Sequence, residues 1–285
     1  MVTVFTPTYN RRSELEKLYN SLLKQDKEDF IWLIVDDGSS DDTKEYINKI
    51  KKDNKININY VYKENGGKQS AYNVGVENTK TDIFLCIDSD DILKPNILKT
   101  IINDFKKIKD KHDICGVAYI QDYIKKTNEV IGTEFREDNE YRSYFDIYNT
   151  DKVMGDKLIV LKSDIAKEYK FPIIECEKFV PEALVFNRLA KKYKLLCRNI
   201  IAASKDYLDG GYSNKYFDLV KRNPKGNRLY FKEAYDFKKS LYNIYGYILF
   251  SIYAKYKFRD IVMEHDAKIK VILMYIPVWI ISKFK

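Results

Sequence analysis

The apolar run at 83–87 ends abruptly in four polar residues, Asp88, Ser89, Asp90 and Asp91. A short run that is apolar on both faces is typical of a central strand covered by helices on each side. The carboxylates therefore fall at the carboxyl end of that strand, which is where open α/β sheets bind ligands. Packed acids repel one another unless a cation shares them, and their hard oxygens suit Mg²⁺ or Mn²⁺.

An acidic turn that caps the helix expected after Pro95 would explain the same residues, because Asp and Ser are ordinary turn and N-cap residues. The rest of the chain favours a site, since three other expected strands also end in polar residues. These are Thr8 and Asn10 after 1–6, Asp36 and Asp37 after 30–35, and Asn65 and Lys68 after 57–62. Strands that alternate with helices predict a mostly parallel sheet, so the four polar ends should meet at one edge.

The helices and strands that must position these residues are predicted from hydrophobic periodicity and from residues that start or end helices. Helices are expected at 13–24, 42–52, 69–78 and 95–108, and Ser13 and Glu16 stand in capping-box positions. Later strands are expected at 114–120, 157–161 and 195–203, with helices at 163–169 and 181–193. Composition shifts to Tyr-, Phe- and Lys-rich helical sequence near Pro224, so we expect two domains, 1–225 and 226–285.

The overall composition is globular, with 45% hydrophobic and 32% charged residues among 285. A formal net charge of +8 favours anionic partners such as nucleotide phosphates or acidic lipid headgroups. No nucleic-acid-binding motif is present, so nucleic acid is not an expected partner. The first apolar run is too short for a signal peptide, and we expect a cytoplasmic chain. His112 and His265 stand in charged, helix-like segments typical of surface histidines.

The segment 268–285, KIKVILMYIPVWIISKFK, is apolar but shorter than the roughly 20 residues of a membrane-spanning helix. Pro277 interrupts it, while lysines at both ends and Trp279 suit a segment that lies on a membrane surface. A helix packed on the first domain is the alternative. The membrane interpretation places the protein on the inner face of the cell membrane.

Four motifs within the first hundred residues together resemble the family-two glycosyltransferases. They are VTVFTPTYNR, VDDGSSDDT, ENGGKQSAYNVG and IDSDD, the last in the place of the family's DXD motif. The resemblance is to bacterial enzymes that build capsular or other surface polysaccharides. It implies an α/β fold, a GT-A type Rossmann-like nucleotide-diphospho-sugar transferase domain with a mostly parallel central sheet, followed by a C-terminal helical extension.

The resemblance also implies how a nucleotide-sugar would bind. Pro7, Thr8 and Tyr9 would line one side of the pocket for the uracil base, and Asp37 would accept a hydrogen bond from the uracil ring. Lys68 would lie near the nucleotide or its diphosphate. For Asp37 a turn or N-cap role is the alternative, and for Lys68 an exposed loop position.

Within the DXD motif, the resemblance implies that Asp88 contacts the ribose side and Asp90 binds the Mn²⁺ or Mg²⁺, with Ser89 between them. Inversion at the anomeric carbon needs one general base for the acceptor hydroxyl. In this family a carboxylate that opens a later helix supplies it, which here is Glu182. Pro181 stands where the family often has an acid, and a Glu in a first helical turn is also ordinary.

Two further carboxylates compete for a role at the site. Asp156 would lie on the acceptor side, and Asp209, in LDGGYS, belongs to a segment that could close over the donor as a flap.

The favoured function is therefore an inverting, metal-dependent glycosyltransferase. It would move a hexose or N-acetylhexosamine from a UDP-sugar to a lipid-linked oligosaccharide or surface-polysaccharide acceptor. A phosphatase with an aspartyl nucleophile is disfavoured, because its acidic motif would follow the first strand rather than the fourth. A non-catalytic nucleotide-binding scaffold in a polysaccharide assembly complex remains the alternative.

Overall fold

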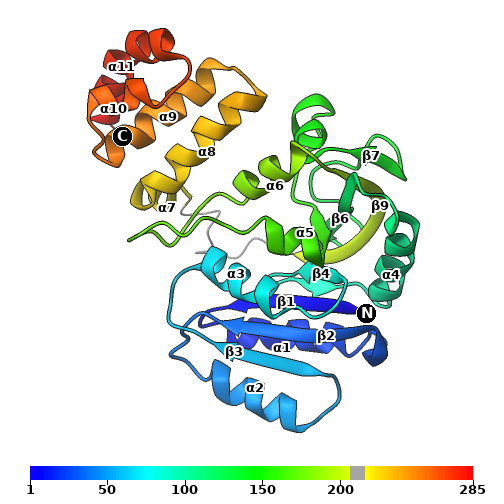
Figure 1. The fold of residues 1–285 in the computed structure, drawn as a ribbon. Helices are drawn as coiled ribbons and strands as arrows, with labels where there is room; N and C mark the ends of the chain where they lie inside the picture. The colour runs from blue at the N-terminus through cyan, green and yellow to red at the C-terminus, as the bar shows by residue number, and fades with distance from the viewer. Residues whose placement is uncertain (206–215, 285) are drawn as a thin grey trace. The chain divides into compact units, whose positions relative to one another are not determined.

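The computed structural model describes residues 1–205 and 216–284 (Figure 1). The chain divides into two compact units. The first contains Met1–Lys170 and Arg188–Tyr207, and the second contains Phe171–Asn187 and Leu208–Lys285. The domain boundary near residue 225 stays a prediction.

The first half of the sheet is parallel, as the sequence predicts. Its strands are β1 (Val2–Thr8), β2 (Phe30–Asp36), β3 (Ile58–Tyr62) and β4 (Ile83–Cys86), in the order β3-β2-β1-β4. All three pairings are parallel. The carboxyl ends of these strands therefore lie at the same edge of the sheet, blue to cyan in Figure 1.

The second half of the sheet mixes strand directions. Strand β8 (Leu158–Lys162) lies antiparallel between β4 and β6 (Ile114–Tyr123), and β9 (Lys194–Lys205) is parallel to β6. The short strands β5 (Ile92–Leu93) and β7 (Glu140–Arg142) pair antiparallel with β9. Strand β8 is antiparallel to both β4 and β6, so β6 and β9 run in the same direction as β4. The last residue of β9, Lys205, therefore lies at the same edge of the sheet as Asp88.

Helices cover both faces of this sheet. Leu18 of α1, Ile47 of α2 and Ile101 of α4 share one buried cluster with Val4 and Trp32. The helices of the first unit are α1 (Arg12–Leu22), α2 (Thr43–Lys52), α3 (Lys68–Asn78), α4 (Ile97–Ile108) and α5 (Ser163–Glu168), with short turns at Lys27–Asp29 and Asp146–Thr150.

Helix α3 packs on the opposite face, because alternate residues of a strand point to opposite sides. Phe5 follows Val4 in β1, and an added Cβ on Gly75 of α3 would lie 2.4 Å from the Phe5 ring. The expected capping box of α1 does not form. Its N-cap is Arg11, and the Glu16 carboxylate instead accepts from Arg12 at 2.7 Å.

The second unit is helical. Helix α6 (Ala183–Ala190) begins in it, and it continues with α7 (Tyr216–Arg222), α8 (Pro224–Phe237), α9 (Leu241–Tyr253), α10 (Phe258–Met263) and α11 (Lys268–Ser282). Its core contains Phe231, Ile244, Tyr247, Ile248 and Val271. The Glu177 carboxylate accepts the backbone N–H groups of Lys225 and Gly226 at 2.7 and 2.8 Å, which caps the start of α8.

Two expectations for the second unit are wrong. His265 is only 2% exposed, because the Tyr235 and Tyr247 rings pack on its imidazole. Helix α11 runs through Pro277 rather than stopping there, at the loss of one intrahelical donor. Among the described helices, none is both long and apolar enough to cross a bilayer.

Candidate functional site

Asp37 organises the loop that follows β3. Its carboxylate, 4% exposed, accepts the backbone N–H groups of Gly66 and Gly67 at 2.9 and 2.7 Å. It also accepts from Lys63 Nζ at 2.6 Å and from Asn65 Nδ2 at 3.1 Å. Gly67 has a φ of +90°, which favours glycine at this position. The loop at 63–67 is therefore folded around one carboxylate.

The neighbouring Asp36 closes the end of β2. It is fully buried, and its carboxylate accepts from Tyr60 Oη and from the Ser39 backbone N–H, both at 2.8 Å. Burial and the Asp36 hydrogen bond raise the pKa of Tyr60. Asp36 therefore acts as a turn residue in this structure, while Asp37 faces the loop at 63–67.

The residues after β1 join the same edge. Pro7 and Thr8 are buried at the end of the strand, whereas Tyr9 is 49% exposed. The Asn10 backbone N–H donates to Ser39 Oγ at 2.9 Å, which ties the loop after β1 to the loop after β2. The exposed Tyr9 ring beside these loops could contact a base by stacking.

The two outer carboxylates of the DXD motif form ion pairs. Lys68 Nζ lies 2.7 Å from Asp88 Oδ1, and Arg11 Nη1 lies 3.4 Å from Asp90 Oδ2. Lys68 is the first residue of α3, directly after the loop held by Asp37. Thus the predicted residues Asp37, Lys68, Asp88 and Asp90 are brought together at one edge of the sheet.

A third cation, Lys205, enters this cluster from the end of β9. Its Nζ lies 3.1 Å from Asp156 Oδ2, and its side chain is only 17% exposed. Burial alone would lower the pKa of Lys205, but the charges of Asp91, Asp88 and Asp156 raise it above its usual value. Lys205 therefore connects Asp156 electrostatically to the DXD motif.

The same charges set the ionisation of the acids. Burial would raise the pKa of Asp88, but Lys68 and Lys205 hold it below its usual range. For Asp91, 4% exposed, burial and the neighbouring Asp88 and Asp90 raise the pKa to about 8, against the opposing effect of Lys205. Ser89, which stands between Asp88 and Asp90 in the sequence, is also buried.

The acids fit a divalent cation by their chemistry. Mg²⁺ and Mn²⁺ bind through one or two carboxylates together with water and substrate phosphates, so a complete protein cage is not required. Within 1–205 and 216–284, no group of three or more His, Cys, Asp or Glu side chains has the arrangement of a metal site. Asp88 and Asp90 supply hard oxygens that are partly exposed, 33% and 28%.

The structure does not test the roles of two other predicted residues, Glu182 and Asp209. Glu182 is exposed, lies directly before α6, and belongs to the second unit. Asp209 lies outside the described residues. The roles of Glu182 and Asp209 stay predictions.

Sequence reasoning missed three cations, Arg11, Lys63 and Lys205. Arg11 closes the VTVFTPTYNR motif and Lys63 directly follows β3, so both adjoin residues that were singled out. Lys205 ends a strand, as the recognised polar residues do. Extending the strand-end rule to β9 would have found it.

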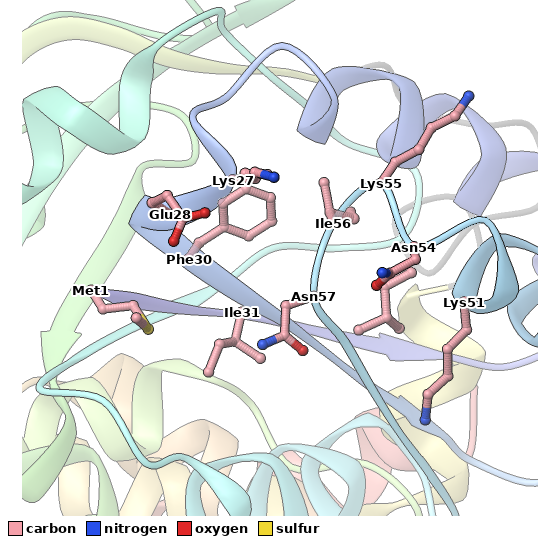
Figure 2. A pocket seen from close by; sticks show the side chains of 11 residues that line it. Met1, Lys27, Glu28, Phe30, Ile31, Lys51, Asn54, Lys55, Ile56 and Asn57 are labelled. Carbon is pink, nitrogen blue, oxygen red and sulfur yellow. The ribbon is translucent and has the colours of Figure 1, made fainter.

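A separate hollow of about 470 Å³ lies at the other end of the parallel strands. It is lined by residues just before β1, β2 and β3, by the first residues of β2 and β3, and by the end of α2, and these include Lys27, Lys51 and Lys55 (Figure 2). In Figure 2 the Lys51 and Lys55 side chains point in opposite directions, so their charges do not converge. Ligands of open α/β sheets bind at the carboxyl edge, which argues against this hollow as the donor site.

The family model for "Glycosyl transferase family 2" matches residues 3–169, more than half of the chain. The chain therefore belongs to glycosyl transferase family 2. The match contains every strand-end residue described above except Lys205.

Curated relatives match over less than half of the chain. Glycosyltransferase GlyG of Streptococcus pneumoniae is 31% identical over 124 residues, which is 43% of this chain and 40% of that protein. An uncharacterized glycosyltransferase of Nostoc sp. is 28% identical over 130 residues, 46% of this chain and 39% of the relative. The chain thus spans less than half the length of these relatives.

Solved structures share the GT-A type fold over most of the chain. S. aureus TarS 1–349 in complex with UDP-GlcNAc aligns with a TM-score of 0.60 at 19% identity, covering 97% of this chain and 90% of TarS 1–349. A mannosyltransferase from Pyrobaculum calidifontis, in complex with GDP-Man and Mn²⁺, aligns with a TM-score of 0.58 at 16% identity, covering 89% and 74%. At these identities the likeness establishes the fold alone.

Proposed function

We propose that this chain is an inverting glycosyltransferase that moves a hexose or N-acetylhexosamine from a UDP-sugar to a lipid-linked or surface-polysaccharide acceptor. The observation that carries the proposal is the meeting of four motifs of the family at one sheet edge, with Lys68 beside Asp88 and Arg11 beside Asp90. The UDP-GlcNAc complex of TarS, a protein of the same fold, supports a UDP-sugar as donor.

The base would lie against the ends of β1 and β2. Asp37 would accept the uracil imide N–H, and Pro7, Thr8 and Tyr9 would form the wall of the pocket. Of the four groups that donate to Asp37, Asn65 Nδ2 is the most distant, at 3.1 Å. The uracil ring would replace this contact, because the three shorter hydrogen bonds to Asp37 hold the loop at 63–67.

The diphosphate would lie between Lys68 and the DXD motif. Asp90 would hold Mn²⁺ or Mg²⁺, whose charge would stabilise the leaving diphosphate. We extend this metal-binding role to Asp88, for which the resemblance implies a contact on the ribose side, because its carboxylate is also partly exposed at the same edge. The ammonium of Lys68 lies beside Asp88, and the guanidinium of Arg11 lies beside Asp90. Both cations would bind the phosphate oxygens directly. The Mn²⁺ complex of the structurally similar mannosyltransferase supports a divalent ion of this kind.

Glu182 would act as the general base that deprotonates the acceptor hydroxyl, since a single displacement needs one base opposite the leaving group. Its position directly before α6 suits the family pattern. Asp156 would lie on the acceptor side, held by Lys205 at 3.1 Å.

The test is release of UDP from a panel of UDP-sugars, measured with wild type, Glu182→Gln and Glu175→Gln. Glu175 is an exposed carboxylate in the same unit and serves as the matched control. We expect UDP release to fall at least about a hundredfold in Glu182→Gln alone, with UDP binding unchanged. UDP binding without UDP release in wild type would instead support the scaffold.

The acceptor proposal rests on the second unit. Residues 216–285 contain fourteen Lys and Arg against six Asp and Glu. Helix α11 exposes Ile269, Leu273 and Ile276 to 75%, 72% and 66%. An apolar helical face flanked by lysines suits the surface of an anionic membrane. The protein would therefore bind peripherally to the inner face of the cell membrane, where a lipid-linked acceptor would be within reach.

A further inference from the structure

The acids of the DXD motif that solvent reaches are already paired with cations of the chain. Lys68 and Asp88, 2.7 Å apart, have side chains 24% and 33% exposed. Arg11 and Asp90, 3.4 Å apart, have side chains 34% and 28% exposed. Both pairs can be reached by a ligand, whereas the side chain of Asp91 is almost fully buried. The two carboxylates that a metal would use are therefore each paired with a cation of the chain itself.

We propose that metal and diphosphate bind by exchange of these two ion pairs, so that each ligand alone binds weakly and the two strengthen each other. The inference rests on the proposed function and adds a coupling between its two ligands. Arg11 and Lys68 pass from the carboxylates to the diphosphate, while Asp88 and Asp90 pass from these cations to the metal.

The argument is one of charge. A divalent cation that arrives alone at Asp88 meets the ammonium of Lys68, and its attraction to the carboxylate is largely cancelled. A diphosphate that arrives alone at Lys68 meets the carboxylate in the same way. When both arrive, every charge gains a new opposite partner. The reciprocity of linkage then requires that the metal strengthen diphosphate binding by the same factor as the diphosphate strengthens metal binding.

Lys205 does not take part in this exchange. Its side chain is 17% exposed and is bound to Asp156 at 3.1 Å. It also lies close enough to Asp88 and Asp91 for its charge to affect both. Lys205 therefore stays as the fixed counter-ion that keeps the acidic cluster together while Lys68 and Arg11 change partners.

The neighbouring Arg12 provides a matched control. It stands next to Arg11 in the chain, but its guanidinium pairs with Glu16 at 2.7 Å and with Asp42 at 3.7 Å. Replacing Arg12 removes the same charge from nearly the same place in the sequence without touching the Asp88 and Asp90 pairs. Differences between Arg11→Gln and Arg12→Gln therefore report the ion pair rather than the net charge.

The experiment measures Mn²⁺ alone by the paramagnetic resonance signal of the free ion, UDP alone by calorimetry, and each ligand at saturation of the other. Wild type should show a coupling factor of at least about tenfold, equal in both directions. The double variant Arg11→Gln, Lys68→Met should bind Mn²⁺ alone on the order of tenfold more tightly than wild type, bind UDP alone more weakly, and lose most of the coupling. Arg12→Gln should match wild type.

Asp88→Asn adds a result with the opposite sign: it should bind UDP alone more tightly than wild type, because Lys68 is released. Mn²⁺ affinity that is unchanged or reduced in the double variant, or UDP affinity that falls in Asp88→Asn without metal, would overturn the exchange. If UDP binds wild type under no condition, the proposed function fails. The metal-only comparison of wild type with the double variant still decides the inference in that case.

Discussion

Asp37 and Gly67 are thirty positions apart in the chain, yet the Gly67 backbone N–H donates to the Asp37 carboxylate at 2.7 Å. The same carboxylate accepts the Gly66 backbone N–H at 2.9 Å. Lys68, the next residue, begins α3 and reaches Asp88. Asp37, the residue proposed to bind the uracil base, therefore also holds the loop that precedes Lys68, the residue proposed to bind the diphosphate.

Asp37→Asn should destabilise the protein and misplace this loop. An amide has one acceptor oxygen where the carboxylate has two, so at least one buried donor loses its partner. That loss is worth about 1–3 kcal/mol of unfolding free energy. Thermal and urea unfolding measure it, and UDP titration should show weakened binding as well. Asp42→Asn, whose side chain is 70% exposed, is the control and should unfold like wild type.

Gly75→Ala tests the packing of α3 on the sheet. Alanine is the better helix former by about 1 kcal/mol. The added Cβ, however, would lie 2.4 Å from the buried Phe5 ring. We expect the overpacking to win, with a net loss of about 1–3 kcal/mol in urea unfolding. Glu77→Ala, at an exposed position of the same helix, should be nearly neutral. A stabilised Gly75→Ala protein would contradict the close approach of α3 to β1.

His265 should make the stability of the second unit depend on pH. Its Nδ1 accepts the Ala267 backbone N–H at 3.0 Å, and within the described part of the chain its Nε2 has no hydrogen-bond partner. Burial lowers the pKa of His265, and Lys232 and Arg228 add to this effect, against Asp266 and Asp236. The folded protein therefore holds the neutral imidazole.

Because the folded pKa lies below the unfolded value of about 6.5, the unfolded chain binds the proton more readily. Stability should accordingly fall as the pH is lowered through and below that value. Melting temperatures measured between neutral and mildly acidic pH should fall less in His265→Gln than in wild type. His112, the other histidine, is exposed, and His112→Gln should keep the wild-type slope. Equal slopes in all three proteins would show that His265 does not carry the effect.

The exposed face of α11 predicts binding to lipid. Leu273→Glu combined with Ile276→Glu places two charges on side chains that are 72% and 66% exposed. Cosedimentation with anionic vesicles should weaken at least about tenfold, because two apolar side chains no longer enter the membrane surface. Ile173→Glu, at a position 70% exposed and also in the second unit, is the control. Vesicle binding that is equal in the wild type and the double variant would leave α11 without this role.

Much of the site could be predicted because the rule behind it is simple. Parallel strands end at one edge, so polar residues after β1, β2 and β4 had to meet. The partners of Asp37 were not predictable, because they depend on the path of the loop through Gly67, whose φ is +90°. Sequence patterns identify such a loop but not which carboxylate it surrounds.

The direction of β8 and the burial of His265 were also not predictable, because both depend on how distant segments of the chain pack. An apolar run at 157–161 indicates a strand, but the long segment before it lets the chain enter the sheet from either end. The structure pairs β8 antiparallel with β4 and β6. His265 has charged neighbours in sequence, but it is buried in the fold, where the rings of Tyr235 from α8 and Tyr247 from α9 pack on its imidazole.

The most direct test of the account is calorimetric titration of wild type with UDP, GDP and dTDP, each with and without Mn²⁺. We predict that UDP alone among the three binds, that Mn²⁺ strengthens its binding, and that Asp90→Asn removes the effect of the metal. Binding of none of the three nucleotides, with or without Mn²⁺, would contradict the roles given to Asp37, Lys68 and Asp90.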